Sequence, residues 1–394
     1  MPGVSTEHSH AAARASGEST RLLRADVMIN VLIGTRAQLI KMAPVLLGLE
    51  RQGTPVRLIM SGQHHATMAE LLREFGVATT PMFLYEGREI TGVVQMGTWF
   101  ARMLWRGARR RHVLFVRAGG RRDCMVVHGD TLSTLLGALL GRLLGMAVVH
   151  VESGLTTGRW REPFPEELTR RLVFRLADLA FCPDAWSAAN MGRFRAEVVD
   201  TGANTIIDAV QEALRHFDEV RVDAPPAPYA VVSLHRFENI FAITRFSFIV
   251  SMLERIAARV PLVFVLHPAT QKQAEKFGLL QRLRDHPSIV LAPRMTYVPF
   301  LKLLVGAQFV VSDGGSNQEE LAWLGIPTLL MRAATERQDG LDGTVVISNY
   351  DEAVIEGFVA LRLGACTVRP AFQTAVQPAK MIADLLAAKY GSPS

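Results

Sequence analysis

Cysteine is scarce in this sequence. Its 394 residues include only Cys124, Cys182 and Cys366, and none of the three belongs to a CxxC pair or a Cys/His cluster. A disulfide framework and a zinc ribbon are therefore both excluded. We expect a protein of a reducing, cytoplasmic environment that holds no metal ion.

Long apolar runs are also missing. The most apolar stretch, 132–151, is interrupted by Arg142 and His150, so a buried helix followed by a buried strand explains it better than a membrane span. Residues 1–26 contain no apolar run of the kind that a signal peptide requires, and they predict a flexible tail. The sequence therefore predicts no integral membrane span.

Two nucleotide-binding signatures are absent. The sequence has no GxGxxG motif and no Walker A lysine motif. Their absence argues against a dinucleotide redox cofactor and against ATP held by a P-loop. We expect no cofactor.

Acidic residues are missing from one long basic segment. The formal net charge is +6, but eight arginines and no acid lie between Arg102 and Arg122, so the rest of the chain carries −2. A local patch of this kind favours a solvated loop or a phosphate-rich partner, and we expect no nucleic acid partner. Because Trp105, Leu114 and Phe115 interleave with the arginines, contact with an anionic membrane surface is a further hypothesis.

Short apolar runs typical of strands alternate with helical patterns from Val27 onward. This alternation predicts an α/β fold in which helices cover both faces of a parallel sheet. It stops at 221–229, where the chain contains three prolines, and then restarts. We therefore predict two doubly wound, Rossmann-like domains that face a cleft.

The prediction divides the chain into five parts. They are a flexible tail (1–26), an N-terminal domain (27–220), a linker (221–228), a C-terminal nucleotide-binding domain (229–376) and a C-terminal helix that packs back on the N-terminal domain (377–394).

Two glycine turns predict a site for a nucleoside diphosphate. In the second domain, Gly314 and Gly315 leave a strand and enter a helix, where the backbone can approach an anion closely. Glu320 follows about one turn later, where its carboxylate can accept hydrogen bonds from ribose hydroxyls. In the first domain, a similar turn adds Arg36 for a phosphate. A capped helix after a turn is the alternative interpretation.

Three acids and one histidine predict acid–base chemistry. Asp130, Glu152 and His235 follow apolar strands, and Glu166 opens a predicted helix. Ligands bind beyond the carboxyl ends of parallel strands, and neighbouring carboxylates there can divide general acid and general base work. His235 can reach a phosphate or a leaving oxygen. Taken singly, Asp130 can instead cap a helix, and Glu166 can complement a helix dipole.

Together, the motifs resemble those of the non-hydrolysing UDP-N-acetylglucosamine 2-epimerases. The similarity extends from about Val27 to Ser348, and its strength lies in the order and number of the motifs. They include GTRAQLIKMAPV, SGQHHATM, HGDTLSTL, HVESGLTTG, PFPEELTRR, TGANTIIDA, HRFEN, SDGGSNQEE and TERQDGLDGTV. The resemblance implies the two-domain architecture shared with GT-B glycosyltransferases, and a homodimer is usual in the family.

The resemblance also assigns roles to residues. Arg36, the turn of Gly314, Gly315 and Ser316, and Arg337 are expected at the diphosphate, Glu320 at the ribose, and Asp130, Glu152, Glu166 and His235 in the catalytic set. The implied reaction inverts C2 of a UDP-N-acetylhexosamine, UDP-GlcNAc to UDP-ManNAc or a modified analogue. UDP leaves and then adds back to an enzyme-bound 2-acetamidoglucal. Asp130 and Glu166 are expected nearest C2, with Glu152 in support.

Several positions depart from the family pattern, and the usual DSGGIQEE is DGGSNQEE here. Gln38 replaces an acid, Thr156 an arginine and Thr169 an asparagine. The expected carboxylates are unaffected, so these changes leave the identity of the sugar open.

A second group of departures concerns regulation. Bacterial members can bind a second UDP-GlcNAc beside the active site, partly through a QHR turn, which here is QHH from Gln63 and His64 onward. Arg236 and His267 are further possible contacts of this second site, and HxNP has become HPAT at His267. We predict that activation by a second substrate molecule is weakened or rearranged.

Two other functions remain open. One is a GT-B-type glycosyltransferase that uses a UDP-sugar donor, and the other is a UDP-sugar-binding protein with little activity. Three candidate acids favour the epimerase, because a transferase needs a single base and an acceptor cleft. A glycal formed without an acceptor would favour the epimerase, and binding without turnover would favour the binding protein.

Overall fold

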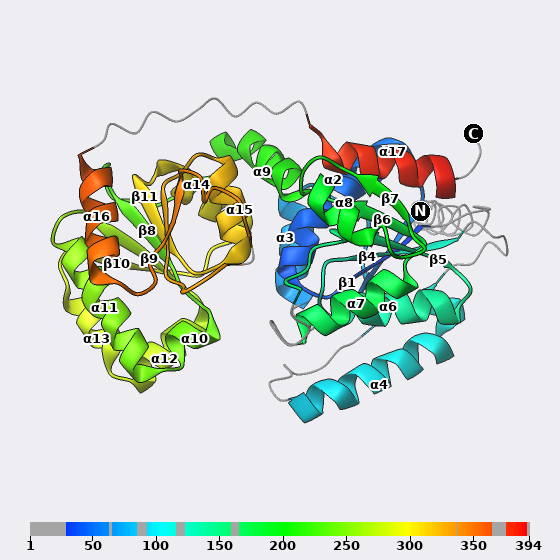
Figure 1. Cartoon of the computed structure of the whole chain (residues 1–394), viewed down its shortest axis with the longest axis horizontal. Helices are drawn as coiled ribbons and strands as arrows, with labels where there is room; N and C mark the ends of the chain where they lie inside the picture. The colour runs from blue at the N-terminus through cyan, green and yellow to red at the C-terminus, as the bar shows by residue number, and fades with distance from the viewer. Residues whose placement is uncertain are drawn as a thin grey trace, which may run out of the picture. The chain divides into compact units, whose positions relative to one another are not determined.

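The computed structural model describes residues 29–62, 65–84, 93–115, 123–158, 165–335, 337–364 and 376–391. The chain forms two compact units (Figure 1). Unit 1 contains the residues up to Thr205 together with those from Val376 onward, and unit 2 extends from Ile206 to Ala375. The predicted N-terminal tail, 1–26, lies outside the described residues.

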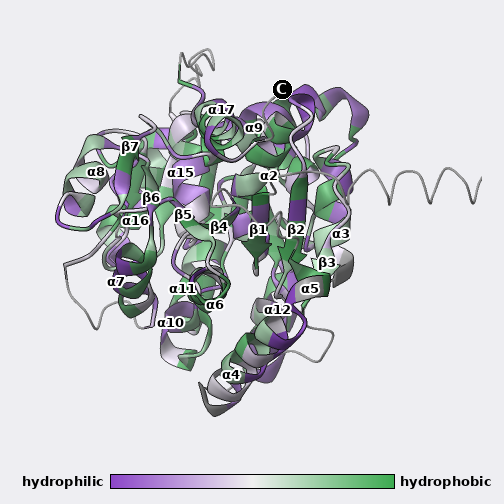
Figure 2. Cartoon of the chain, turned by 90° about the vertical axis from the view of Figure 1, so that its right-hand side faces the viewer, coloured by the Kyte–Doolittle hydropathy of each residue, from purple (hydrophilic) through white to green (hydrophobic). Residues whose placement is uncertain are grey.

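Unit 1 is built on a parallel sheet of seven strands in the order β3-β2-β1-β4-β5-β6-β7. The strands are β1 (Ile29–Ile33), β2 (Val56–Met60), β3 (Met82–Phe83), β4 (Cys124–His128), β5 (Ala147–Val151), β6 (Leu179–Cys182) and β7 (Glu197–Asp200). All residues of β1 and β4 are buried, and Figure 2 shows the apolar character of these central strands. Continuous apolar runs of this kind suit strands that are covered on both faces.

Helices cover this sheet. They are α2 (Arg36–Arg51), α3 (His65–Glu74), α4 (Val93–Arg109), α5 (Arg111–Leu114), α6 (Leu132–Leu143), α7 (Glu166–Leu176), α8 (Ala185–Met191) and α17 (Pro378–Tyr390). α17 packs against α2 through buried Ile382, Ala383 and Leu386. The C-terminal helix therefore belongs to unit 1, although the whole of unit 2 separates it from the rest of that unit in the sequence.

Helix α4 forms an additional layer outside α6 (Figures 1 and 2). Met103 is fully buried, and a Cβ on Gly107 would lie only 2.7 Å from a methyl carbon of Leu140 in α6. One narrow face of α4 thus packs on the unit, and the opposite face is exposed.

Unit 2 repeats the design with six parallel strands in the order β10-β9-β8-β11-β12-β13. The strands are β8 (Ala230–Ser233), β9 (Leu262–Leu266), β10 (Ile289–Pro293), β11 (Phe309–Ser312), β12 (Thr328–Leu330) and β13 (Val345–Ile347). The helices are α9 (Ile206–Arg215), η1 (Phe217–Glu219), α10 (Phe237–Ile240), α11 (Ile243–Ala257), α12 (Pro268–Lys276), α13 (Leu279–Asp285), α14 (Tyr297–Gly306), α15 (Gly315–Trp323) and α16 (Glu352–Leu363). The predicted class, two doubly wound α/β domains, is confirmed.

The boundary between the units differs from the predicted one. The sequence predicts 206–220 in the first domain and the linker at 221–228, but α9 packs against α14 and α15 of unit 2. Lys302 of α14 also donates hydrogen bonds to the carbonyls of Phe217 and Val220, at 2.6 and 2.7 Å. The proline-rich segment is therefore an internal connection of unit 2, because the helix before it has its apolar partners there.

Each sheet has one point at which the strand order reverses. In unit 1 it lies between β1 and β4, and in unit 2 between β8 and β11. Loops at the carboxyl ends of such neighbouring strands diverge and leave room for a ligand. No helix in the described ranges is both long and apolar enough to cross a bilayer.

Candidate active site

The end of β1 lies very close to the start of α6. A Cβ on Gly34 would lie 1.9 Å from the Ser133 hydroxyl oxygen, so glycine alone permits this approach. Thr35 then caps α2, and its side chain accepts a hydrogen bond from the Gln38 N–H group. The glycine turn that contains Arg36 is therefore fixed by packing as well as by capping.

Gln38 joins the two strand ends at the reversal point. Its Oε1 accepts hydrogen bonds from the backbone N–H groups of Gly34 and Thr35, at 2.9 and 3.1 Å. Its Nε2 donates to the His128 carbonyl oxygen at 2.5 Å and to the Thr134 hydroxyl at 3.0 Å. An amide supplies both an acceptor and a donor, whereas a carboxylate only accepts. This network explains how glutamine is accommodated where the resemblance expects an acid.

Glu152, directly after β5, is held by side chains from three other parts of unit 1. Its carboxylate pairs with the buried ammonium of Lys41, accepts a hydrogen bond from Asn204 Nδ2 at 2.5 Å, and lies 3.7 Å from His128 Nε2. Its φ is +62°, a left-handed conformation that is strained in a non-glycine residue and occurs preferentially at functional sites. The loop therefore holds this carboxylate at one fixed position.

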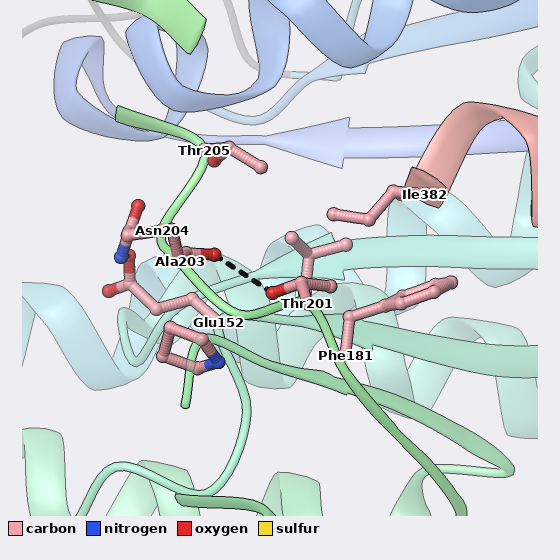
Figure 3. Close-up of a pocket in the computed structure, with 9 residues that line it drawn as sticks. Glu152, Phe181, Thr201, Ala203, Asn204, Thr205 and Ile382 are labelled. Carbon is pink, nitrogen blue, oxygen red and sulfur yellow. Dashed lines mark hydrogen bonds between the residues drawn. The ribbon is translucent and has the colours of Figure 1, made fainter. Parts of the chain in front are cut away.

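A small pocket opens beside Glu152 (Figure 3). It is lined by Val151, Glu152, Phe181, Pro183, Thr201, Ala203, Asn204, Thr205 and Ile382. In Figure 3 the Asn204 amide points toward the Glu152 carboxylate, and the Thr201 hydroxyl donates to the Ala203 carbonyl at 2.8 Å. Because Ile382 comes from α17, the last helix completes the wall of a pocket beside a candidate catalytic acid.

His150 supports the turn that carries Asp130. It is fully buried in β5, and its Nε2–H donates to the Gly129 carbonyl at 2.8 Å. Burial lowers the pKa of His150 to about 4, despite the opposing hydrogen bond to Gly129 and the charges of Glu152 and Asp130. The imidazole is therefore neutral at pH 7 and serves as a fixed donor.

Helix α7 orients Asp130 through Arg170. Arg170 Nη2 donates to Asp130 Oδ2 at 2.5 Å, and Nη1 lies 3.4 Å from the buried Glu167 carboxylate. Burial acts to raise the pKa of Glu167, but hydrogen bonds from Thr156, Thr157 and Arg171 outweigh it and hold this pKa below its usual value. Thr156, at the position where the resemblance expects an arginine, thus donates a hydrogen bond to Glu167. Glu167 is a structural anion.

Glu166 differs from its neighbour. It is partly buried at the first position of α7, and its Oε2 is buried with no hydrogen-bond partner among the described residues. An unpaired buried carboxylate oxygen is unfavourable in the absence of a ligand. Glu166 is therefore the candidate acid that is least committed to the fold.

In unit 2, Asp313 joins the two strand ends. This buried carboxylate accepts hydrogen bonds from the backbone N–H groups of His235 and Arg236, both at 3.0 Å, and from Asn239 Nδ2 at 2.9 Å. The His235 ring, whose Nδ1 lies 3.3 Å from Asp313, stays 43% exposed. Asp313 thus fixes the loop after β8 and leaves the other face of the imidazole for a ligand.

Helix α15 begins beside that imidazole. Gly314 is its N-cap, and a Cβ there would lie 3.1 Å from His235 Cε1. The first backbone N–H groups of a helix favour an anion, and Gly315 and Ser316 provide them. Glu320 is buried one turn further on, with 3% exposure.

Arg337 stands near this turn but is paired. Its guanidinium forms an ion pair with Glu319, and its carbonyl accepts a hydrogen bond from Gln318 Nε2 at 3.2 Å. The structure therefore ties Arg337 to α15, with its charge offset by a carboxylate.

Comparison with known proteins decides the family. A sequence profile of the UDP-N-acetylglucosamine 2-epimerase family matches residues 49–365. This chain belongs to that family. It is 31% identical to the UDP-N-acetylglucosamine 2-epimerase of Yersinia pestis over 335 residues, covering 80% of this chain and 85% of that protein. It is 27% identical to the enzyme of that name from Methanocaldococcus jannaschii over 345 residues, covering 83% and 90%.

Solved structures agree on the fold. The crystal structure of the M. jannaschii UDP-GlcNAc 2-epimerase in complex with UDP-GlcNAc and UDP superposes with a TM-score of 0.77 at 24% identity. It covers 92% of this chain and 99% of that chain. At that identity the likeness supports the fold, and the sequence matches carry the family.

The structure describes only two of the four residues that are expected at a second site, Arg236 and His267. Gln63 and His64 lie outside the described residues, so weakened activation by a second substrate molecule stays a prediction. Arg236 donates to Glu238 at 2.5 Å, and His267 caps α12 by accepting the Ala269 N–H at 3.3 Å. Across the described part of the chain, no cluster of three or more His, Cys, Asp or Glu side chains could hold a metal ion.

The structure adds residues that hold the candidate site residues and that the sequence alone does not reveal. Lys41 and Asn204 fix Glu152, Arg170 fixes Asp130, and Asp313 fixes His235. Each lies inside a quoted motif, but each has the pattern of an ordinary helix or loop residue there. The available signal was charge: a lysine or arginine on the apolar face of a predicted helix requires a buried anion as partner.

Proposed function

We propose that this chain inverts C2 of a UDP-N-acetylhexosamine by elimination and re-addition of UDP. The observation that carries the proposal is the set of acids at the strand ends of unit 1, held by Lys41 and Arg170 within an epimerase-family chain. Unit 1 would supply the proton chemistry, and unit 2 the nucleotide site. UDP-GlcNAc is the first substrate to test, because the relatives are named for it.

The nucleotide roles follow from the start of α15. The N–H groups of Gly315 and Ser316 would bind the diphosphate, and buried Glu320 would accept hydrogen bonds from ribose hydroxyls. His235, with its ring held by Asp313, would donate to a phosphate oxygen. Arg36 remains a candidate phosphate ligand, whereas Arg337 would act on phosphate only after leaving Glu319 or through the charge of that pair.

The reaction needs an acid and a base on opposite faces of the sugar. The hydrogen on C2 is not adjacent to a carbonyl, so its removal must accompany departure of the diphosphate. One carboxylate takes the C2 proton, the C2–H electron pair forms the C1–C2 double bond, and the C1–O bond breaks toward UDP. UDP then adds to C1 of the 2-acetamidoglucal while a carboxylic acid returns a proton to the other face of C2.

Glu166 and Asp130 are the proposed proton carriers. Glu166 has a buried oxygen with no partner in the described ranges, and Asp130 is oriented by Arg170. Oε2 of Glu152 accepts from both Lys41 and Asn204, which suits a supporting charge better than a proton carrier. Departing UDP would be stabilised by preorganised hydrogen-bond donors, which usually contribute more to the rate than any other single effect.

A glycosyltransferase that uses a UDP-sugar donor is the second candidate. Transfer of the sugar to an acceptor would use the same nucleotide site, but it would need an acceptor and a single base. The several acids fixed in unit 1 favour the epimerase. The resemblance supports a homodimer and the scarcity of cysteine supports a cytoplasmic location, and both are part of the proposal.

Proton NMR of the protein with UDP-GlcNAc in D₂O tests the function. We expect deuterium at C2 and new anomeric signals of UDP-ManNAc, without any acceptor. Glu166→Gln should slow exchange about 10²- to 10⁴-fold, the usual contribution of a general acid or base. Glu70→Gln, on the exposed surface of α3, is the matched control and should exchange at the wild-type rate.

The outcomes separate the candidates. Exchange or free glycal without the manno product would retain the mechanism and assign another UDP-HexNAc as substrate. UDP release that requires an added sugar acceptor would support the transferase and overturn the proposal. Binding of UDP-HexNAcs with neither C2 exchange nor acceptor-dependent release of UDP would reject both.

A further inference from the structure

Helix α4 carries an exposed stripe that no step of the proposed reaction uses. Arg102, Trp105 and Arg109 recur at a spacing of three and four residues, so they share one face of the helix. All three are exposed, and the Trp105 side chain is 59% accessible. The opposite face holds buried Met103 and packs on α6, so the stripe points away from the unit.

The stripe combines positive charge with an aromatic ring. The guanidinium carbon of Arg109 lies 5.1 Å from the centre of the Trp105 ring, a cation–π arrangement that keeps the two side chains together. Arg110 is also exposed, next to α5. The sequence contains no acid between Glu89 and Asp123. No carboxylate in this part of the sequence therefore offsets the positive charge of the stripe.

We propose that α4 docks this chain on a bilayer surface that contains anionic phospholipid. A helix with basic residues and an exposed tryptophan on its outer face suits that surface, where arginines meet headgroup phosphates and the indole enters the interface. The fold presents α4 as an outer layer on α6, so the helix can meet a flat surface without unfolding (Figures 1 and 2). Docking leaves the strand-end acids unchanged and is independent of the proposed reaction.

The number of exposed aromatic rings favours phospholipid over nucleic acid here. A groove that tracks a single strand needs several aromatic platforms in series along a basic channel, whereas the described face of α4 presents one indole among arginines. A flat anionic interface requires one amphipathic anchor and several surrounding cations. Each arginine adds a modest, salt-sensitive attraction, so the contact is reversible.

Vesicle sedimentation of the full chain tests the proposal. We use vesicles of phosphatidylcholine with about 30% phosphatidylglycerol, and pure phosphatidylcholine vesicles as reference. Binding should occur only with phosphatidylglycerol and should fall steeply as salt is raised, because the Debye length shrinks to a few ångströms near 1 M. R102A/R109A should weaken binding roughly tenfold or more.

The matched control is R193A/R195A. Arg193 and Arg195 are also exposed in unit 1, and Arg193 lies 5.2 Å from the Phe194 ring, so the control loses the same charge beside an aromatic ring. This variant should bind as the wild type does. Equal losses in both double variants would show a net-charge effect and overturn the proposal.

A second measurement does not depend on charge removal. Brominated phosphatidylcholine in the anionic vesicles quenches tryptophans that enter the interface, and W105F should remove most of that quenching while circular dichroism shows a folded protein. Unchanged quenching in W105F would overturn the proposal. Tighter binding to a single-stranded oligonucleotide than to the vesicles, weakened by W105F, would also overturn the proposal, since it would assign the stripe to nucleic acid.

Discussion

At the residue scale, one polar side chain closes each reversal point. Gln38 in unit 1 and Asp313 in unit 2 both bridge the loop after the first strand to its neighbour, one through an amide and the other through a carboxylate. The hydrogen-bonding groups around each side chain explain why one is an amide and the other a carboxylate. Gln38 faces two N–H donors and a carbonyl acceptor, whereas Asp313 faces donors from the backbone and Asn239.

The buried His150 makes stability depend on pH. Its pKa is about 4 in the folded chain and about 6.5 when unfolded, so the unfolded state binds more protons between these values. Stability must therefore fall as the pH drops from 6.5 toward 4, by about 2 kcal/mol between pH 7 and pH 5. Urea unfolding at the two pH values measures this loss.

The matched variant for this prediction is His150→Gln, whose amide can still donate to the Gly129 carbonyl. It should be less sensitive to pH over the same interval, since it removes the titrating group and retains the donor. Glu167 does not interfere, because its pKa is held below the usual value and its contribution is lost only at more acidic pH. A pH dependence identical to that of the wild type would contradict the role of His150.

At the element scale, unit 1 depends on the contact of α17 with α2. The two helices approach so closely that a Cβ on Gly48 would lie 2.8 Å from the Cβ of Ala383. Ala383 is fully buried, and small residues at a crossing permit backbones to approach. This contact also places Ile382 in the pocket beside Glu152.

Ala383→Leu should destabilise unit 1 by about 1–3 kcal/mol, because the added carbons must displace Gly48 and its helix. Met381 of the same helix is 42% exposed, so Met381→Leu should change stability by less than about 0.5 kcal/mol. Urea unfolding followed by circular dichroism gives both values. Equal effects would mean that α17 does not pack as described.

At the scale of the whole molecule, the sequence predicts the two doubly wound units well. Alternating strands and helices dominate, and the motifs fall at strand ends, so the positions of Asp130, Glu152 and His235 follow from topology. The sequence does not predict which side chains pair with these residues. The partners Lys41, Arg170 and Asp313 come from segments far apart in the sequence, whereas residue spacing predicts contacts only within one helix or strand.

The sequence does not predict the unit boundary, for a related reason. A run of prolines indicates a break in regular structure. Whether the preceding helix belongs to the first or the second unit depends on tertiary packing. Helix α9 packs on α14 and α15, and its apolar face gives no sign of that choice. Local composition therefore placed the linker too late.

If unit 2 holds the nucleotide, UDP should protect amides there. Hydrogen exchange with saturating UDP should slow up to about a hundredfold at 233–239 and 312–320, since a ligand at a hundred times its Kd stabilises its site by about 2.7 kcal/mol. The strand 147–151 in unit 1 should change little. Protection confined to unit 1 would contradict the assignment of the nucleotide site.

Unit 1 is interrupted in sequence by all of unit 2, and this sets an order for biosynthesis. A ribosome makes α2 early and α17 only after residues 206–375 have been synthesised. Unit 2 can thus complete its core during translation, while unit 1 waits with the α17-binding surface of α2 uncovered. The last helix acts as the closing element of the first unit, and the newly made chain is most exposed to aggregation just before that helix arrives.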